Sequence, residues 1–161
     1  MKTCLVVFYS RTGITREVAT EIAKAGGCDL EEVHDVKTRS GWLGYACSLY
    51  EAVTAKLPKI KTTSLDPAEY QTVVLGTPVW AGNMSSPMRS YIAQNNGRFK
   101  RIATFCTMGG SGGDKALENV AALCDARPVA KLVLTDKQIE NKQYLEQHVA
   151  AFVKALMPGS T

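Results

Sequence analysis

The stretch from Ser10 to Thr15 carries the first chemical signal in this chain. It places three hydroxyl side chains and one glycine between an apolar run at residues 4–9 and a helical pattern that begins at Ile14. A strand that turns directly into a helix aims backbone N–H groups and the positive end of the helix dipole at one point. Hydroxyls add donors there, and Gly13 lets the backbone come close to a ligand. The stretch therefore predicts an anion site, and phosphate is the anion that such sites most often hold.

Other phosphate motifs do not fit this turn. A Walker loop needs Gly-Lys-Ser or Gly-Lys-Thr, and the dinucleotide fingerprint needs three spaced glycines; neither occurs here. An ordinary strand-to-helix turn, in which Ser and Thr only cap the helix, is an open alternative.

Two further unusual loops follow later apolar runs. After residues 70–76 comes Thr77-Pro78-Val79-Trp80-Ala81-Gly82-Asn83-Met84, and after residues 101–107 comes Met108-Gly109-Gly110-Ser111-Gly112-Gly113. Ligands of open parallel sheets bind beyond the carboxyl ends of the strands, so these loops should converge with the first one. A flat heteroaromatic ring would find an aromatic face in Trp80 and close backbone approach at the glycines. The alternative for Trp80 is a core aromatic packed on the rim of the sheet.

The remaining pattern supplies the elements that position these loops. Short buried-type runs alternate with helical periodicity along the chain, which predicts an α/β fold whose parallel sheet is covered on both faces. The strands are expected at residues 4–9, 28–33, 70–76, 101–107 and 129–134, and the helices at 14–25, 41–55, 86–97, 114–125 and 140–156. The segments at 34–40 and 56–67 are expected to be loops, and the 161 residues to form a single domain (1–161).

At this point the three loops resemble a known family. Ser10-x-Thr12-Gly13-x-Thr15 after a strand, Gly-Thr-Pro-Val-Trp-Ala-Gly, and Phe-Cys-Thr-Met-Gly-Gly-Ser-Gly-Gly are similar to the three flavin loops of flavodoxin-like proteins. The resemblance covers nearly the whole chain and implies a doubly wound five-stranded sheet of order 2-1-3-4-5, with noncovalent FMN as cofactor. By this match the phosphate would lie at Ser10, Arg11, Thr12, Gly13, Ile14 and Thr15. The ring would lie between Thr77, Pro78, Val79, Trp80, Ala81, Gly82 and Asn83 on one side and Thr107, Met108, Gly109, Gly110 and Gly113 on the other.

The resemblance implies redox chemistry carried by the cofactor, with no catalytic side chain. An electron-transfer protein and an NAD(P)H-dependent reductase of quinones or similar acceptors are both open, with a flavin-free binding module as a third class. The chain departs from flavodoxins in being basic, at +4, and in lacking a tyrosine in the third loop. Neither ring loop contains Asp or Glu, so a reduced, anionic flavin would be less disfavoured than in an acidic flavodoxin.

Composition argues against nucleic-acid-binding and membrane proteins. Basic residues are scattered among acids, which argues against nucleic acid, and no apolar run is long enough for a membrane span or resembles a signal peptide. We expect a cytoplasmic protein, a monomer or homodimer, whose partner is a redox protein or a small electron donor or acceptor. The 5 widely spaced cysteines argue against disulfides or a metal site, and most of them are expected to be buried thiols.

Two other protein classes fit the motifs of this chain less well. Phospho-receiver domains need acids after the first and third strands, where this chain has Tyr9-Ser10 and Gly76-Thr77. Small cysteine phosphatases need Cys-x5-Arg, and the spacing from Cys4 to Arg11 fails. Cys106 ends the fourth strand, where we expect a buried thiol rather than a nucleophile.

Overall fold

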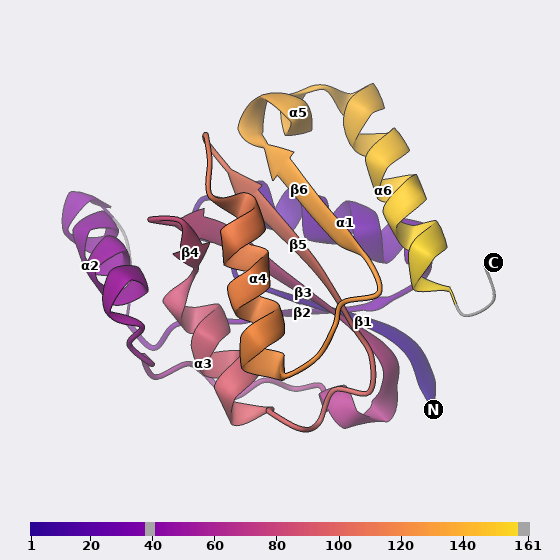
Figure 1. Ribbon diagram of the computed structural model, residues 1–161, viewed down its shortest axis with the longest axis horizontal. Helices are drawn as coiled ribbons and strands as arrows, with labels where there is room; N and C mark the ends of the chain where they lie inside the picture. The colour runs from indigo at the N-terminus through magenta and orange to yellow at the C-terminus, as the bar shows by residue number, and fades with distance from the viewer. Residues whose placement is uncertain (38–40, 158–161) are drawn as a thin grey trace.

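A twisted parallel sheet forms the centre of the molecule (Figure 1). The computed structural model describes residues 1–37 and 41–157. Five strands lie in the order β2-β1-β3-β5-β6, and a short β4 pairs antiparallel with the end of β3. The order is the one predicted, since β5 and β6 are the predicted fourth and fifth strands. The strands are β1 (Lys2–Phe8), β2 (Asp29–Glu32), β3 (Tyr70–Trp80), β4 (Asn83–Met84), β5 (Ile102–Met108) and β6 (Lys131–Thr135).

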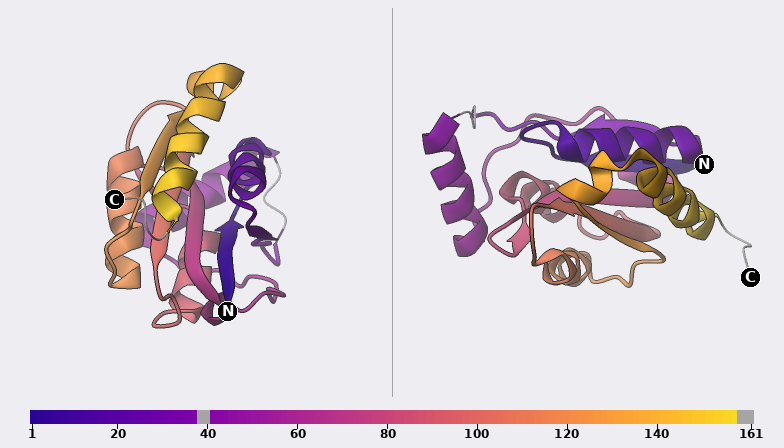
Figure 2. Two further views of the ribbon diagram at one scale, coloured as in Figure 1. Left: turned by 90° about the vertical axis from the view of Figure 1, so that its right-hand side faces the viewer. Right: turned by 90° about the horizontal axis from the view of Figure 1, so that it is seen from above.

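Helices cover both faces of this sheet, as predicted (Figure 2). Helices α1 (Ile14–Gly26) and α6 (Lys142–Leu156) pack together on one face, and α3 (Ser86–Gln94) and α4 (Gly113–Cys124) on the other. The central strands are therefore buried on both sides, which explains their continuous apolar runs. One tight contact lies inside the sheet, where Gly76 is paired with Phe105: a Cβ on Gly76 would lie 2.1 Å from the Phe105 ring.

Several element boundaries differ from the sequence-based prediction. Strand β3 continues through Trp80 and turns back at β4, so the predicted loop 77–84 is a β-hairpin. The predicted final helix at 140–156 corresponds to α6, and a short helix that was not predicted, α5 (Asp136–Glu140), precedes it. Asn141 separates the two helices and caps α6 with its side chain. A 3-10 turn at Pro67–Glu69 (η1) precedes β3, and α3 ends at Gln94 rather than near Gly97.

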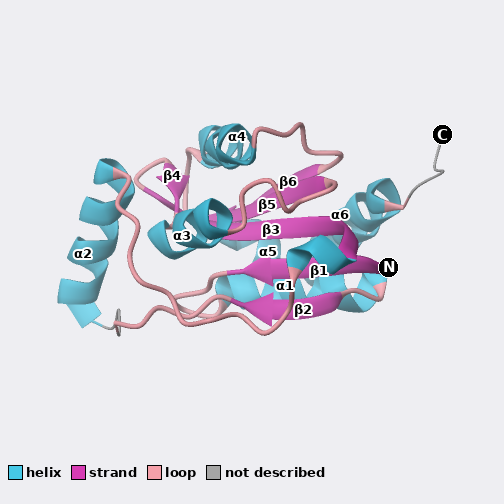
Figure 3. Ribbon diagram, turned by 90° about the horizontal axis from the view of Figure 1, so that it is seen from below, coloured by secondary structure: helices cyan, strands magenta, loops and turns pink. Residues whose placement is uncertain are grey.

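Helix α2 (Gly41–Thr54) stands apart from the two helical layers (Figure 3). Its position in sequence agrees with the predicted helix at 41–55. It lies at the end of the molecule toward which the carboxyl ends of the parallel strands point. The predicted loop 34–40 precedes it, and residues 38–40 of that loop lie outside the described residues. No helix in the described ranges is long and apolar enough to cross a membrane.

Candidate functional site

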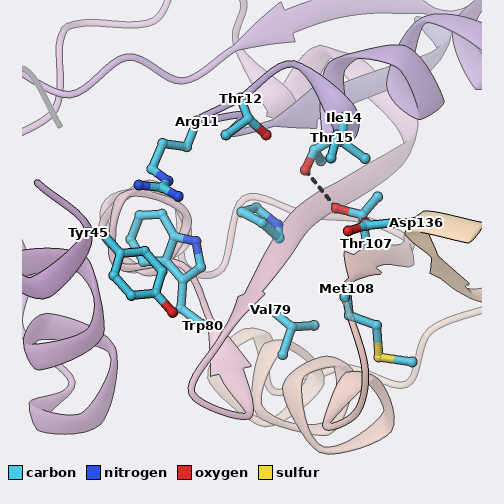
Figure 4. Close-up of a pocket in the computed structure, with 12 residues that line it drawn as sticks. Arg11, Thr12, Ile14, Thr15, Tyr45, Val79, Trp80, Thr107, Met108 and Asp136 are labelled. Carbon is cyan, nitrogen blue, oxygen red and sulfur yellow. Dashed lines mark hydrogen bonds between the residues drawn. The ribbon is translucent and has the colours of Figure 1, made fainter. Parts of the chain in front are cut away.

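A pocket of about 330 Å³ opens where the three predicted loops meet (Figure 4). It lies at the carboxyl ends of β1, β3 and β5, which is the edge of the sheet predicted to bind a ligand. Every predicted loop contributes to its wall. The lining residues are Arg11, Thr12, Ile14, Thr15, Tyr45, Pro78, Val79, Trp80, Thr107, Met108, Gly109 and Asp136.

The first loop leaves the N-terminus of α1 available to an anion. Gly13 is the N-cap residue in a left-handed conformation, with φ 99°, and no side chain caps the helix. The Ser10 hydroxyl accepts a hydrogen bond from the Gly13 N–H at 3.0 Å, which shapes the turn before the helix. The first amides of a helix have no partner within the helix, so these N–H groups can bind a ligand. The simple capping interpretation therefore does not describe this turn.

A buried pair of hydroxyls joins the first loop to the third. Thr15 Oγ1 and Thr107 Oγ1 lie 2.9 Å apart, and both residues are almost fully buried. One hydroxyl of such a pair donates and the other accepts, so one proton remains for a further acceptor. The pair fixes the start of α1 against the end of β5 and adds a polar floor to the pocket.

Trp80 provides the aromatic wall and also belongs to the core. It ends β3 and is 8% exposed, and its ring meets the Tyr9 ring edge-on at 5.5 Å and 89°. Trp80 therefore packs as a core aromatic on one side and faces the pocket on the other, so both predictions for it hold in part. Its indole is held rigidly by Tyr9 while one side of it borders the pocket.

The second and third loops touch through their backbones. Ala81 and Gly82 form the two-residue turn between β3 and β4, and both have positive φ, at 49° and 72°. A Cβ placed on Gly112 would lie 2.8 Å from the Gly82 Cα, and Gly112 itself has φ 93°. Only glycine fits at this contact, which brings the two ring loops together beside the pocket.

Comparison with known proteins agrees with this architecture. A family model described as Flavodoxin matches residues 3–156. The chain belongs to the flavodoxin family. The comparison with curated proteins found no match.

Solved flavoproteins have the same fold as this flavodoxin-family chain. A flavoprotein from Lactobacillus acidophilus, solved in complex with FMN, is 21% identical with a TM-score of 0.71 over 88% of this chain and 98% of that one. A WrbA-like flavodoxin from Agrobacterium tumefaciens is 14% identical with a TM-score of 0.57, covering 97% and 98% of the two chains. A flavodoxin from the domain Archaea is 20% identical, with a TM-score of 0.52, and covers 96% and 99%.

FMN is the cofactor of the flavodoxin family, and the residues present fit it. The free helix N-terminus and the hydroxyls around it suit a phosphate. The rigid indole of Trp80 suits the face of a flavin ring, and the glycine contact between the ring loops suits close backbone approach. The FMN expectation for this family member is thus confirmed.

Two predicted ring residues hold the second loop in place. The Asn83 side-chain oxygen accepts hydrogen bonds from Met84 N, Arg89 and Asn119, each at 2.9 Å, which ties the hairpin to α3 and α4. The Thr77 hydroxyl is buried and accepts from Ser85 N at 2.9 Å. These two side chains act within the protein and position the loop that carries Trp80.

Other predicted residues are not part of the pocket lining. Gly113 is buried as the first residue of α4, where a Cβ would meet Val133 at 2.6 Å. Ser10, Gly13, Ala81, Gly82 and Gly110 belong to the three loops but do not line the cavity. That these backbones contact a ligand stays a prediction.

Two lining residues were missed by the sequence analysis. Tyr45 comes from α2, and the Arg11 guanidinium lies 5.1 Å from the centre of its ring. Asp136 comes from the start of α5 and lies beside Gly109. Asp136 directly follows β6, so the rule that ligands bind at carboxyl ends could have found it. Nothing in the sequence marks Tyr45, because the position of α2 is set by the tertiary structure.

The electrostatics of the site are simple. Among the lining residues, Arg11 is the cation and Asp136 the acid. Arg16, in the first turn of α1, is engaged elsewhere, since its guanidinium donates to both carboxylate oxygens of Glu32 at 3.0 and 2.6 Å. Asp136 corrects the expectation of a ring environment without acids: neither ring loop has one, but the folded site does.

Cys106 is a buried thiol, as expected. Its side chain is fully buried under α4, and burial raises the pKa of the thiol to about 12. A thiol protonated at neutral pH is a poor nucleophile, so catalysis by Cys106 is not supported. Within residues 1–37 and 41–157 there is no group of three or more His, Cys, Asp or Glu side chains that could hold a metal.

Proposed function

We propose that this chain is an electron-transfer flavoprotein that binds one FMN in the pocket between its three loops. The observation that carries the proposal is the combination, in one pocket, of an uncapped helix N-terminus with a rigid tryptophan. The L. acidophilus flavoprotein of the same fold, solved with FMN, supports the choice of cofactor. When bound, FMN supplies the electron-accepting and electron-donating chemistry.

In this proposal the chain binds and orients the cofactor. The first amides of α1 and the Thr12 and Thr15 hydroxyls would hold the phosphate, with charge-assisted hydrogen bonds worth roughly 1.5–3 kcal/mol each. Trp80 would cover one face of the ring, and the backbones of the two ring loops would meet its polar edge. Tyr45 would close the pocket on the side of α2.

A second candidate is an NAD(P)H-dependent reductase of quinones or similar acceptors. It is favoured by the charge of the site, where Arg11 offsets Asp136. A one-electron carrier of low potential needs negative charge to disfavour the reduced flavin anion, and this pocket has little of it.

One experiment tests both candidates. The purified protein is reconstituted with FMN and mixed anaerobically with NADH or NADPH while absorbance is followed. An electron-transfer protein stays yellow until a separate flavin-containing reductase is added, whereas bleaching by the nucleotide alone assigns the reductase. Failure to bind FMN after reconstitution would refute both.

A further inference from the structure

Helix α2 exposes an apolar face. Five of its large apolar side chains are between 48% and 76% exposed: Trp42, Leu43, Tyr45, Tyr50 and Val53. Its one charged residue is Glu51, whose carboxylate accepts a hydrogen bond from Ser86 Oγ on α3 at 2.9 Å. The only charge on the helix is therefore used for attachment to the body, and what faces outward is apolar.

The exposed area is that of a protein interface rather than of an ordinary surface. Large aromatic side chains contribute about 150–250 Å² each when they are buried, so the α2 patch offers on the order of 600–800 Å². The largest apolar patch on a monomeric protein is about 300–600 Å². A stable dimer buries about 800 Å² on each partner, which this patch and its flanking Val36 and Leu57 can supply.

The distribution of charge around α2 argues against a membrane surface. Helices that lie in a lipid interface have one apolar face and one strongly charged face, with Lys and Arg along the helix. Helix α2 has no basic residue, and its single acid is bound to Ser86 of α3 rather than arranged on a charged face. It therefore lacks the strongly charged face of a lipid-interface helix, and its apolar face suits contact with protein.

We propose that α2 is the dimerisation surface of this protein and that a second copy of the chain covers it. Two copies related by a two-fold axis would place the same apolar patch against itself. Two cations lie against aromatic rings of the patch: Lys56 Nζ lies 4.8 Å from the centre of the Tyr50 ring, and the Arg11 guanidinium lies over the Tyr45 ring. Both patches would then be covered at once.

Dimerisation would also complete the candidate FMN site. Tyr45 lines the pocket from α2, so a partner that holds α2 in place also holds this wall. This part of the inference rests on the proposed function, and it predicts that FMN affinity increases with protein concentration. The dimer itself can be tested without cofactor, so its failure is distinguishable from failure of FMN binding.

The test is sedimentation velocity of the full chain from about 1 to about 100 µM, a range around common dimer dissociation constants. We expect twice the chain mass of 17.4 kDa for the wild type. Leu43→Ser/Val53→Ser should weaken association at least about a hundredfold, since each removes buried apolar area on both copies. Leu30→Ser/Val129→Ser is the matched control, because these side chains are each 40% exposed outside α2, and it should stay dimeric.

A second measurement uses the tryptophan on α2. In Trp80→Phe, Trp42 is the remaining tryptophan, and its emission should shift to shorter wavelength as concentration rises. A wild type that is monomeric over the whole range, or an α2 variant that stays dimeric, would overturn the proposal. Binding of a monomer to phosphatidylglycerol vesicles that is lost in the α2 variant would also overturn it, in favour of a membrane surface.

Discussion

Replacing Trp80 by phenylalanine should weaken FMN binding by about tenfold while the protein stays folded. The indole borders the pocket and is 8% exposed, and it packs edge-on against Tyr9. Phenylalanine keeps an aromatic ring but removes roughly 50 Å² of apolar contact, which is worth about 1.3 kcal/mol. Trp80→Ala is a poorer test, because deleting a buried tryptophan costs about 3–5 kcal/mol of folding stability.

The assay is a titration of FMN with apoprotein, followed by quenching of flavin fluorescence. Val129→Ala is the control, since Val129 is 40% exposed and lies outside both the pocket and α2. Far-ultraviolet circular dichroism at the titration temperature checks that both variants are folded. An FMN dissociation constant in Trp80→Phe equal to that of the wild type would refute the placement of the flavin ring against this side chain.

Two further predictions concern the loops and the N-terminal edge of the sheet. Gly112→Ala should lower the free energy of unfolding, measured by urea denaturation, by at least about 1 kcal/mol, because Gly112 has a positive φ and contacts Gly82. Gly110→Ala is the control: its Cβ would have no atom within 4 Å, so its free energy of unfolding should equal that of wild type. Tyr70 donates a 2.6 Å hydrogen bond to Asp29, which lowers the pKa of that carboxyl. A lowered pKa contributes stability above the ordinary Asp pKa of about 3.9 and loses it as pH falls through the folded value, so Tyr70→Phe should be less stable than wild type at neutral pH. The measurement is the melting temperature of Tyr70→Phe and of wild type as a function of pH. A difference between the two melting temperatures that widened below pH of about 4 would show that Asp29 is not the group responsible.

Local patterns were sufficient for most of the fold. The buried strands are continuous apolar runs because both faces are covered, and Gly26-Gly27 marks the end of α1, whose C-cap Gly27 has φ 59°. The carboxyl-end rule then located the pocket from the loops alone. The boundaries that failed were those decided by pairing or capping, such as β3 continuing to Trp80 because β4 pairs back onto it.

The sequence by itself determined the order of the strands and helices along the chain, the three loops and the family. These features depend on residues that are neighbours in sequence. Only the tertiary structure decided which side chains of those loops face the pocket. Asn83 turned inward because three donors from separate elements converge on its oxygen. Tyr45 and Asp136 joined the site from α2 and α5, since packing, and not spacing in sequence, brings those helices to the carboxyl edge of the sheet.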